Sequence, residues 1–302
     1  CMNLKPLKYI LPVVIGLGAV YLIAEGVCSN TTREQYKPEQ LAADATDAQR
    51  GQVIANSVNF ALEQELDTLF GWQLNDLFFV PSIFDNKSAY QAGVIYATRQ
   101  ASDVLAKTAA RAGERDTIDP RLTAASGRYF AYGQDVWGFW FIYDCEGKYR
   151  EGIKNWNDWA ASINDGTKKA GVYNVRSDDV YEILKYASTV TELALSYLNS
   201  SSIGHFSADD AIYYAKGVVS VAGNVVRGLA AVDESVAVRG GQENLDEALK
   251  RFDYIAEFDP LYVFAGGNAV GDAMMPNHVA ALARHVDIVN NRINDMLASM
   301  EK

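Results

Sequence analysis

Residues 276–300, PNHVAALARHVDIVNNRINDMLASM, carry the plainest structural signal in the chain. Their large apolar side chains recur at alternating steps of three and four residues, which places them on one face of an α-helix. These side chains are Val279, Leu282, Val286, Val289, Ile293 and Met296. Such spacing forms a heptad seam, but the seam is too short to require a coiled coil. We therefore expect this helix to pack its apolar face inside a domain.

Helical spacing of apolar residues also recurs upstream of this segment. We expect further helices over residues 47–70, 88–112, 149–163, 177–198, 207–229 and 245–258. Ser177 and Ser207 are suited to cap two of them, because acidic residues follow each serine within the first turn. No segment shows the sustained alternation of a β-strand, and no internal repeat is evident. The predicted fold class is all-α, with a multi-helix bundle.

One dense aromatic segment interrupts the helical pattern. Residues 128–148, RYFAYGQDVWGFWFIYDCEGK, contain too many aromatic side chains for a clear helical face. Glycines at 133, 138 and 147 favour loops or short extended structure. We expect this aromatic-rich irregular insert to be buried against the helices.

The first 28 residues predict a membrane anchor. Residues 9–24, YILPVVIGLGAVYLIA, contain no charged side chain. A helix rises ~1.5 Å per residue and the hydrocarbon core is ~30 Å thick, so flanking residues must contribute to the span. We expect residues 1–28 to be a cytoplasmic start and a retained transmembrane helix; a cleaved secretory signal is the alternative. The anchor residues that we single out are Tyr9, Pro12, Gly16, Tyr21 and Ala24.

The basic residues nearest to this helix predict its orientation. Lys5 and Lys8 precede it, and positive charge favours the cytoplasmic side. We therefore expect a bacterial inner-membrane protein with a cytoplasmic N-terminus. Residues 29–47 are polar and contain Pro38, which predicts a tether. Residues 48–302 would then form a helical domain in the periplasm.

Composition and motifs limit the partners and the chemistry. The chain has 27 basic and 38 acidic side chains and a net charge of -11, which argues against a nucleic acid as partner. The sequence contains no nucleophile elbow, zinc-protease motif, redox cysteine pair or phosphate-binding loop. His278 and His285 stand ~10 Å apart along one helix, which is too far for one metal ion. We therefore expect no catalytic residue, no metal and no cofactor; whether Cys28 and Cys145 pair stays open.

Acidic and aromatic residues leave one enzymatic alternative open. A glycosidase needs two carboxylates that flank a sugar bond, and aromatic rings can stack on sugars. The acids near aromatic residues are Asp76, Asp135, Asp144 and Glu146, and tryptophans stand at 72, 137, 140, 156 and 159. Tryptophans of a helical domain are more often core residues. The alternative is therefore a periplasmic cell-wall glycan hydrolase or sugar-binding protein that uses residues 129–151.

Several segments together resemble a known family. They are GWQLNDLFFVP at 71–81, the FDNKSAYQAGVIYATRQ that follows, YREGIKNW at 149–156 and PNHVAALARHVD at 276–287. Over roughly residues 10–300 the chain resembles a bacterial family named only as domain of unknown function 2333. The resemblance implies one N-terminal span and a helix-rich body, and it carries over no activity. Its most specific residues are Trp72, Asn75, Asp76, Leu77, Phe78, Phe79, Pro81, Tyr149, Arg150, Glu151 and Gly152.

We interpret these residues first as structural. Asn75 and Asp76 can bond local backbone in a turn, and apolar neighbours such as Phe78 can hold that turn on the bundle. Arg150 and Glu151 can then pair with the turn.

A domain with many helix faces, no catalytic motif and a bilayer anchor has binding as its default use. We expect a non-enzymatic accessory or scaffold subunit of an inner-membrane or envelope assembly. Its partners would be the bilayer, through the N-terminal helix, and other envelope proteins or copies of itself. A self-assembling ring or filament protein is a second alternative, besides the glycan-directed one.

Overall fold

The computed structural model describes residues 7–28, 31–68, 71–75, 85–112, 117–136, 144–167, 169–200, 203–204, 207–260, 263–264 and 276–301. Its α-helices are α1 (Leu7–Cys28), α2 (Asp47–Leu66), α3 (Asp85–Thr108), α4 (Pro120–Ala124), α5 (Cys145–Ala161), α6 (Ser177–Leu198), α7 (Ala208–Val232), α8 (Ser235–Gly240), α9 (Gln242–Glu257) and α10 (His278–Met300). A 3-10 turn, η1 (Gln73–Asn75), precedes α3, and a π-helical turn, η3 (Ala125–Tyr129), continues α4. The all-α class predicted from the sequence is confirmed.

Local differences from the prediction have physical causes. Strands β1 (Arg111–Ala112) and β2 (Thr117–Ile118) pair antiparallel, and two residues are too few for alternation to reveal a strand. The helix expected from 149 begins at Cys145, because the Asp144 carboxylate accepts a hydrogen bond from the backbone N–H of Gly147. Ser177 is the first residue of α6 rather than its cap, which is Arg176.

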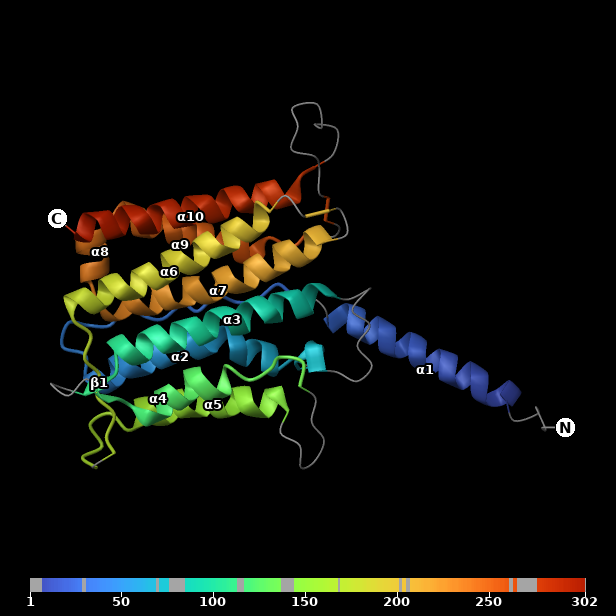
Figure 1. Ribbon diagram of the computed structural model, residues 1–302, viewed down its shortest axis with the longest axis horizontal. Helices are drawn as coiled ribbons and strands as arrows, with labels where there is room; N and C mark the ends of the chain where they lie inside the picture. Colours follow the sequence, from blue (N-terminus) through green and yellow to red (C-terminus); the bar gives the residue numbers. More distant parts are fainter. Residues whose placement is uncertain are drawn as a thin grey trace.

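Helix α7 forms the centre of the bundle and packs against α2, α3, α6 and α9 (Figure 1). It is long and apolar enough to cross a membrane by length and composition, but 94% of its most apolar window is buried against other parts of the protein. Within the described residues, α7 is therefore a core helix. Gly217 of α7 and Gly93 of α3 face the partner helix's backbone, so the two helices approach closely.

Helix α1 extends away from one end of the bundle (Figure 1). Six of its large apolar side chains are between 57% and 68% exposed: Val13, Val14, Ile15, Leu17, Val20 and Ile23. These side chains are not part of the bundle core. Pro12 lies inside the helix, near its start.

The two ends of the bundle differ in what they contain. At the end next to α1, which we call the α1 end, helices α2 and α6 stop and helices α3, α7 and α10 begin (Figure 1). The opposite end contains α8, the β1–β2 pair and the C-terminus (Figure 1). Polar residues that hold α2, α3 and α7 together meet at the α1 end.

Candidate functional site

Residues 31–41, which we call the strap, run over the bundle instead of hanging free. The strap has no helix or strand and lies between α2 and α7. The Tyr36 hydroxyl donates a hydrogen bond to the carbonyl of Val53 on α2, and its ring packs against Phe60 with 5.3 Å between centroids. On the other side, the backbone N–H of Tyr36 donates to the Asn224 side chain of α7 at 3.0 Å. The segment expected to be a polar tether is thus part of the packed structure from Thr31 onward.

The strap covers a polar stripe on the otherwise apolar helix α7. The stripe consists of Lys216, Ser220, Asn224 and Arg227, which lie on one helical face at steps of four, four and three. All four are buried, and each bonds to the strap. Burial of a polar group is costly unless it finds a hydrogen-bond partner, and the strap supplies part of these partners. The others include the Asp253 carboxylate for Arg227 and the Tyr90 hydroxyl for Ser220.

The far end of the strap caps the C-terminal end of α7. The backbone N–H of Leu41 donates to the carbonyl of Ala231 at 3.0 Å, and the Gln40 amide donates to the carbonyls of Ala230 and Ala231. Arg50 of α2 donates to the next carbonyl, that of Val232. The last carbonyls of a helix have no partner within the helix, and here the strap and α2 supply them.

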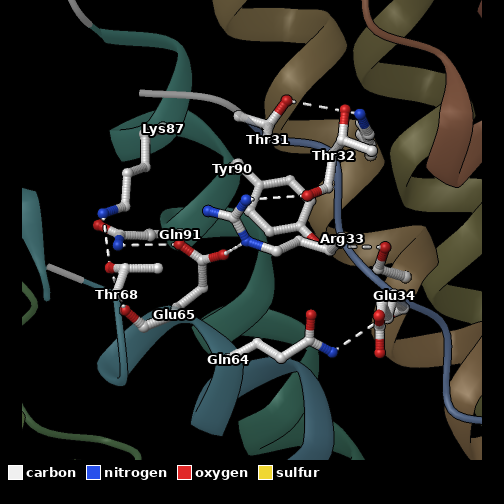
Figure 2. Close-up of polar contacts among 12 residues, drawn as sticks. Thr31, Thr32, Arg33, Glu34, Gln64, Glu65, Thr68, Lys87, Tyr90 and Gln91 are labelled. Atoms are coloured by element: carbon white, nitrogen blue, oxygen red, sulfur yellow. Dashed lines mark hydrogen bonds and ion pairs between the residues drawn. The ribbon is translucent and has the colours of Figure 1, made fainter. Parts of the chain in front are cut away.

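A buried ion pair joins the strap to α2 at the α1 end (Figure 2). Arg33 Nε lies 2.5 Å from Glu65 Oε1; the Glu65 side chain is fully buried and that of Arg33 is 14% exposed. The second carboxylate oxygen of Glu65 accepts a hydrogen bond from the amide of Gln91 on α3 at 3.0 Å. Gln91 also binds the backbone of residues 71 and 73, so one carboxylate connects the strap, α2, α3 and the turn after α2.

A second buried cation lies beside the start of the strap. Lys216 donates to the carbonyl of Phe258 at 3.0 Å and to the Thr31 hydroxyl at 3.4 Å. Burial lowers the pKa of Lys216 to about 8, although the nearby Asp259 carboxylate opposes that shift. Asp259 accepts hydrogen bonds from Thr31, Thr32 and Tyr213. The strap therefore also contacts the segment that follows α9.

The turn around Trp72 matches the residues that the sequence singled out. Trp72 is fully buried; its backbone N–H donates to Glu146 Oε1 at 2.5 Å, and its ring N–H donates to the carbonyl of Gln134 at 2.8 Å. The ring meets Tyr149 edge-on, with 5.0 Å between centroids. Burial raises the pKa of the Glu146 carboxyl, and the hydrogen bond from Trp72 acts in the opposite direction. The structure thus brings Trp72 and Tyr149 into contact, and their contacts stabilise the turn.

Arg150 closes the other side of this turn, whereas Glu151 does not take part. Arg150 pairs with Asp67 at 2.8 Å and donates to the carbonyl of Leu66, at the end of α2. Glu151 is exposed, and its charge acts on Lys154 of the same helix rather than on the described part of the turn. Asn75 lies in η1 without a described side chain, and the remaining residues of this motif lie outside the described part of the chain: Asp76, Leu77, Phe78, Phe79 and Pro81.

The residues of the glycosidase alternative have structural contacts where the structure describes them. Trp72, Trp156 and Trp159 are fully buried and offer no face to a sugar. Asp144 caps α5 and Glu146 binds the Trp72 backbone. Asp135 is exposed, and Trp137 and Trp140 lie outside the described residues.

The described histidine and cysteine side chains have separate structural contacts. His278 accepts from the backbone N–H of Phe264, and His285 stacks on Tyr254. The described ranges hold no group of three His, Cys, Asp or Glu side chains that could bind a metal ion. Cys145 is a buried free thiol whose pKa burial raises to about 12. The side chain of Cys28 is not described, so the pairing of these two cysteines stays open.

Comparison with known proteins gives a family and no activity. The family described as "Uncharacterized protein conserved in bacteria (DUF2333)" matches residues 5–227. That match includes α1, the strap, the Trp72 turn and most of α7. No curated protein and no solved structure matches the chain.

Proposed function

This chain belongs to the uncharacterized bacterial family DUF2333, and we propose that it is a non-enzymatic accessory or scaffold subunit of an inner-membrane or envelope assembly. In this proposal α1 anchors the chain and the bundle offers binding surface in the periplasm. The observation that carries the proposal is the strap, because it joins the bundle to the anchor without a long free linker.

The exposed side chains of α1 support its role as an anchor. Val13, Val14 and Ile15 are consecutive, and successive residues of a helix point ~100° apart, so apolar surface covers more than one face. At ~1.5 Å per residue, the 22 residues of α1 are long enough for the ~30 Å hydrocarbon core of a bilayer when Lys8 and Glu25 lie at its two interfaces. Lys5 and Lys8 favour a cytoplasmic N-terminus, which places the strap and the bundle on the outer side.

The strap supports a role that needs a fixed position. Only residues 29 and 30 separate α1 from Thr31, which is 1% exposed. Arg33 then bonds to α2, and the next residues bond to α7. A free tether lets a domain sample many orientations, whereas a bound strap holds the same end of the bundle close to the anchor. A fixed end suits a subunit that must meet partners in one geometry.

Contacts of the acidic residues favour binding over glycan hydrolysis. Asp144 and Glu146 each accept a hydrogen bond from backbone, so their carboxylates stabilise the start of α5 and the Trp72 turn. A glycosidase would need such groups directed at a substrate.

A flexible insertion between α1 and the strap distinguishes a scaffold that needs a fixed position from an enzyme or binding protein that does not. About six Gly and Ser residues inserted after Asn30 would leave the strap docked and add a flexible link of about 13 Å. The matched control places the same insertion at the exposed turn around Gly166, which lies outside the strap and α1.

The experiment measures whether the full chain stays in the membrane and which partner proteins co-purify with it. We expect all three forms to stay in membranes after an alkaline carbonate wash. After mild cross-linking and extraction in detergent, the unmodified chain and the Gly166 control should co-purify with the same partner proteins. The Asn30 insertion should lose them. Release of the unmodified chain by carbonate would contradict the anchor, and a lone monomer in every preparation would contradict the scaffold role.

A further inference from the structure

A pocket of about 320 Å³ lies between α3, α7, α5 and the residues after η3. Its tyrosines are Tyr96, Tyr132, Tyr149 and Tyr214, and its polar side chains include Arg99, Gln100 and Gln134. None of its described lining residues belongs to the strap, and it shares Gln134 and Tyr149 with the neighbours of Trp72. Its volume lies near the lower limit of sites that bind small ligands or parts of peptides, ~300 Å³.

Three tyrosines form a row that begins in this pocket. The ring of Tyr96 on α3 lies 6.4 Å from that of Tyr214 on α7, and the Tyr214 ring lies 5.0 Å from that of Tyr197 on α6. The rings are tilted by 48° and 46°, so they form ridges with grooves between them rather than one flat platform. Tyr96 is 37% exposed on α3 and Tyr197 is 48% exposed on α6.

Polar groups along this row have no hydrogen-bond partner among the described residues. The hydroxyls of Tyr96, Tyr197 and Tyr214 make no hydrogen bond to the described residues, and the side chains of Arg99 and Gln134 make none either. Phenol, guanidinium and amide groups all supply N–H or O–H donors. The lining that the structure describes contains no carboxylate, although the chain as a whole carries a net charge of -11. The pocket is therefore rich in donors and poor in strong acceptors.

We propose that this tyrosine row binds a proline-rich segment of a partner protein in the polyproline II conformation. Such a helix has no internal hydrogen bonds, so its carbonyls stay free to accept from the phenols and Arg99. Proline has no N–H, so it needs no acceptor. Its pyrrolidine rings fit grooves between aromatic side chains, and one polyproline II turn rises ~9 Å, comparable to the length of the row.

A saccharide fits the same surface less well. Sugar hydroxyls donate as well as accept, and the described lining offers them no carboxylate. Flat sugar faces also stack on exposed flat rings, whereas neighbouring rings here are tilted against each other. The excess of hydrogen-bond donors and the tilt between neighbouring rings both favour a proline-rich peptide over a saccharide.

The test uses the full chain in detergent and a fluorescein-labelled peptide of about twelve prolines, long enough for about four turns. Fluorescence anisotropy should rise to saturation with the proline peptide and not with a Gly-Ser peptide of equal length. Tyr96→Ala and Tyr197→Ala should each weaken binding by about tenfold, the effect of losing one aromatic anchor. Tyr254→Ala is the matched control, because Tyr254 is 45% exposed on α9, away from the row.

Three results would overturn the proposal. They are no saturable binding of the proline peptide up to about 1 mM, the weak end of specific affinity; an equal loss of affinity in Tyr254→Ala; and displacement of the peptide by a short N-acetylglucosamine oligomer, which would assign the row to saccharides. Circular dichroism of each variant at the helical bands checks that the bundle stays folded. The test does not depend on the anchor or on the scaffold role.

Discussion

Replacing Arg33 by methionine tests whether the strap is part of the folded core. The substitution keeps much of the side-chain volume but removes the charge that faces Glu65, which is fully buried. Glu65 would keep one hydrogen bond, from Gln91. Loss of one partner from a buried ion pair costs about 3 to 5 kcal/mol, because a charge is left without compensation in the interior. If the strap is released locally, water can reach Glu65. The loss of stability then cannot exceed the free energy with which the strap binds the bundle.

Urea denaturation of the full chain in detergent measures this cost. Trp72, Trp156 and Trp159 are fully buried, so tryptophan fluorescence reports the loss of the bundle. With a urea slope of about 1 to 3 kcal/mol/M, the midpoint for Arg33→Met should fall by about 1 M or more.

A double-mutant cycle shows whether the loss comes from the pair itself. Glu65→Met alone should cost less than Arg33→Met, because Arg33 is 14% exposed and can reach water. The double variant should be more stable than Arg33→Met, since it no longer buries a lone charge. A loss under about 1 kcal/mol in Arg33→Met, or strictly additive losses, would refute a buried pair that secures the strap.

Three further predictions concern the core. Gly217→Ala should destabilise the protein by about 1 to 3 kcal/mol in thermal denaturation, because the new methyl group meets the backbone of α3; Gly127→Ala, which meets no neighbour, should be neutral or stabilising by up to about 1 kcal/mol. Burial lowers the pKa of Lys216 from 10.5 to about 8, so the unfolded chain binds more protons between these values and stability rises with pH there. Relative to Lys216→Met, the unmodified chain should gain about 2 kcal/mol between pH values of about 7.5 and 9.5 in urea titrations, and a flat difference would contradict this. In a variant whose other cysteines are serine, the Cys145 thiol, with a pKa of about 12, should react with a disulfide reagent only after unfolding.

Periodicity predicted the helices well because their apolar faces are continuous. The residues that identified α10, such as Val286 and Ile293, are fully buried. Periodicity could not predict the short β1–β2 pair or the start of α5 at Cys145, which depend on single hydrogen bonds and on the Asp144 cap.

The candidate site was only partly predictable. Trp72 and Arg150 were identified through the family resemblance, and both hold the turn after α2. The strap was missed because polar composition and Pro38 are typical of a linker, and its hydrogen-bond partners on α7 lie 185 to 192 residues later in the chain. A signal was present, however. Glu65 follows Leu62 by three residues on an apolar face, which marks a buried charge that needs a partner.

The polar stripe of α7 carried a similar signal. Lys216 and Arg227 interrupt an apolar helix at the spacing of one face. That arrangement predicts a polar segment docked along the helix, but the sequence alone does not say which segment. Many polar stretches of the chain have the required donors and acceptors, and only folding selects the strap.

The stripe also matters while the chain is being made. The strap leaves the ribosome before α7, and at about 5 to 20 residues per second the intervening ~190 residues take about 10 to 40 s. In the proposed periplasmic location of the bundle, α7 would reach the membrane as a helix that is long and apolar enough to span it by length and composition. A charged residue near a helix centre opposes insertion by about 2.5 to 3.5 kcal/mol, so Lys216, near the middle of α7, would oppose insertion of this helix into the bilayer. In the folded chain Lys216 and Arg227 lie in the protein interior, where Thr31 and Gln35 of the strap bond to them together with the carbonyl of Phe258 and the carboxylate of Asp253.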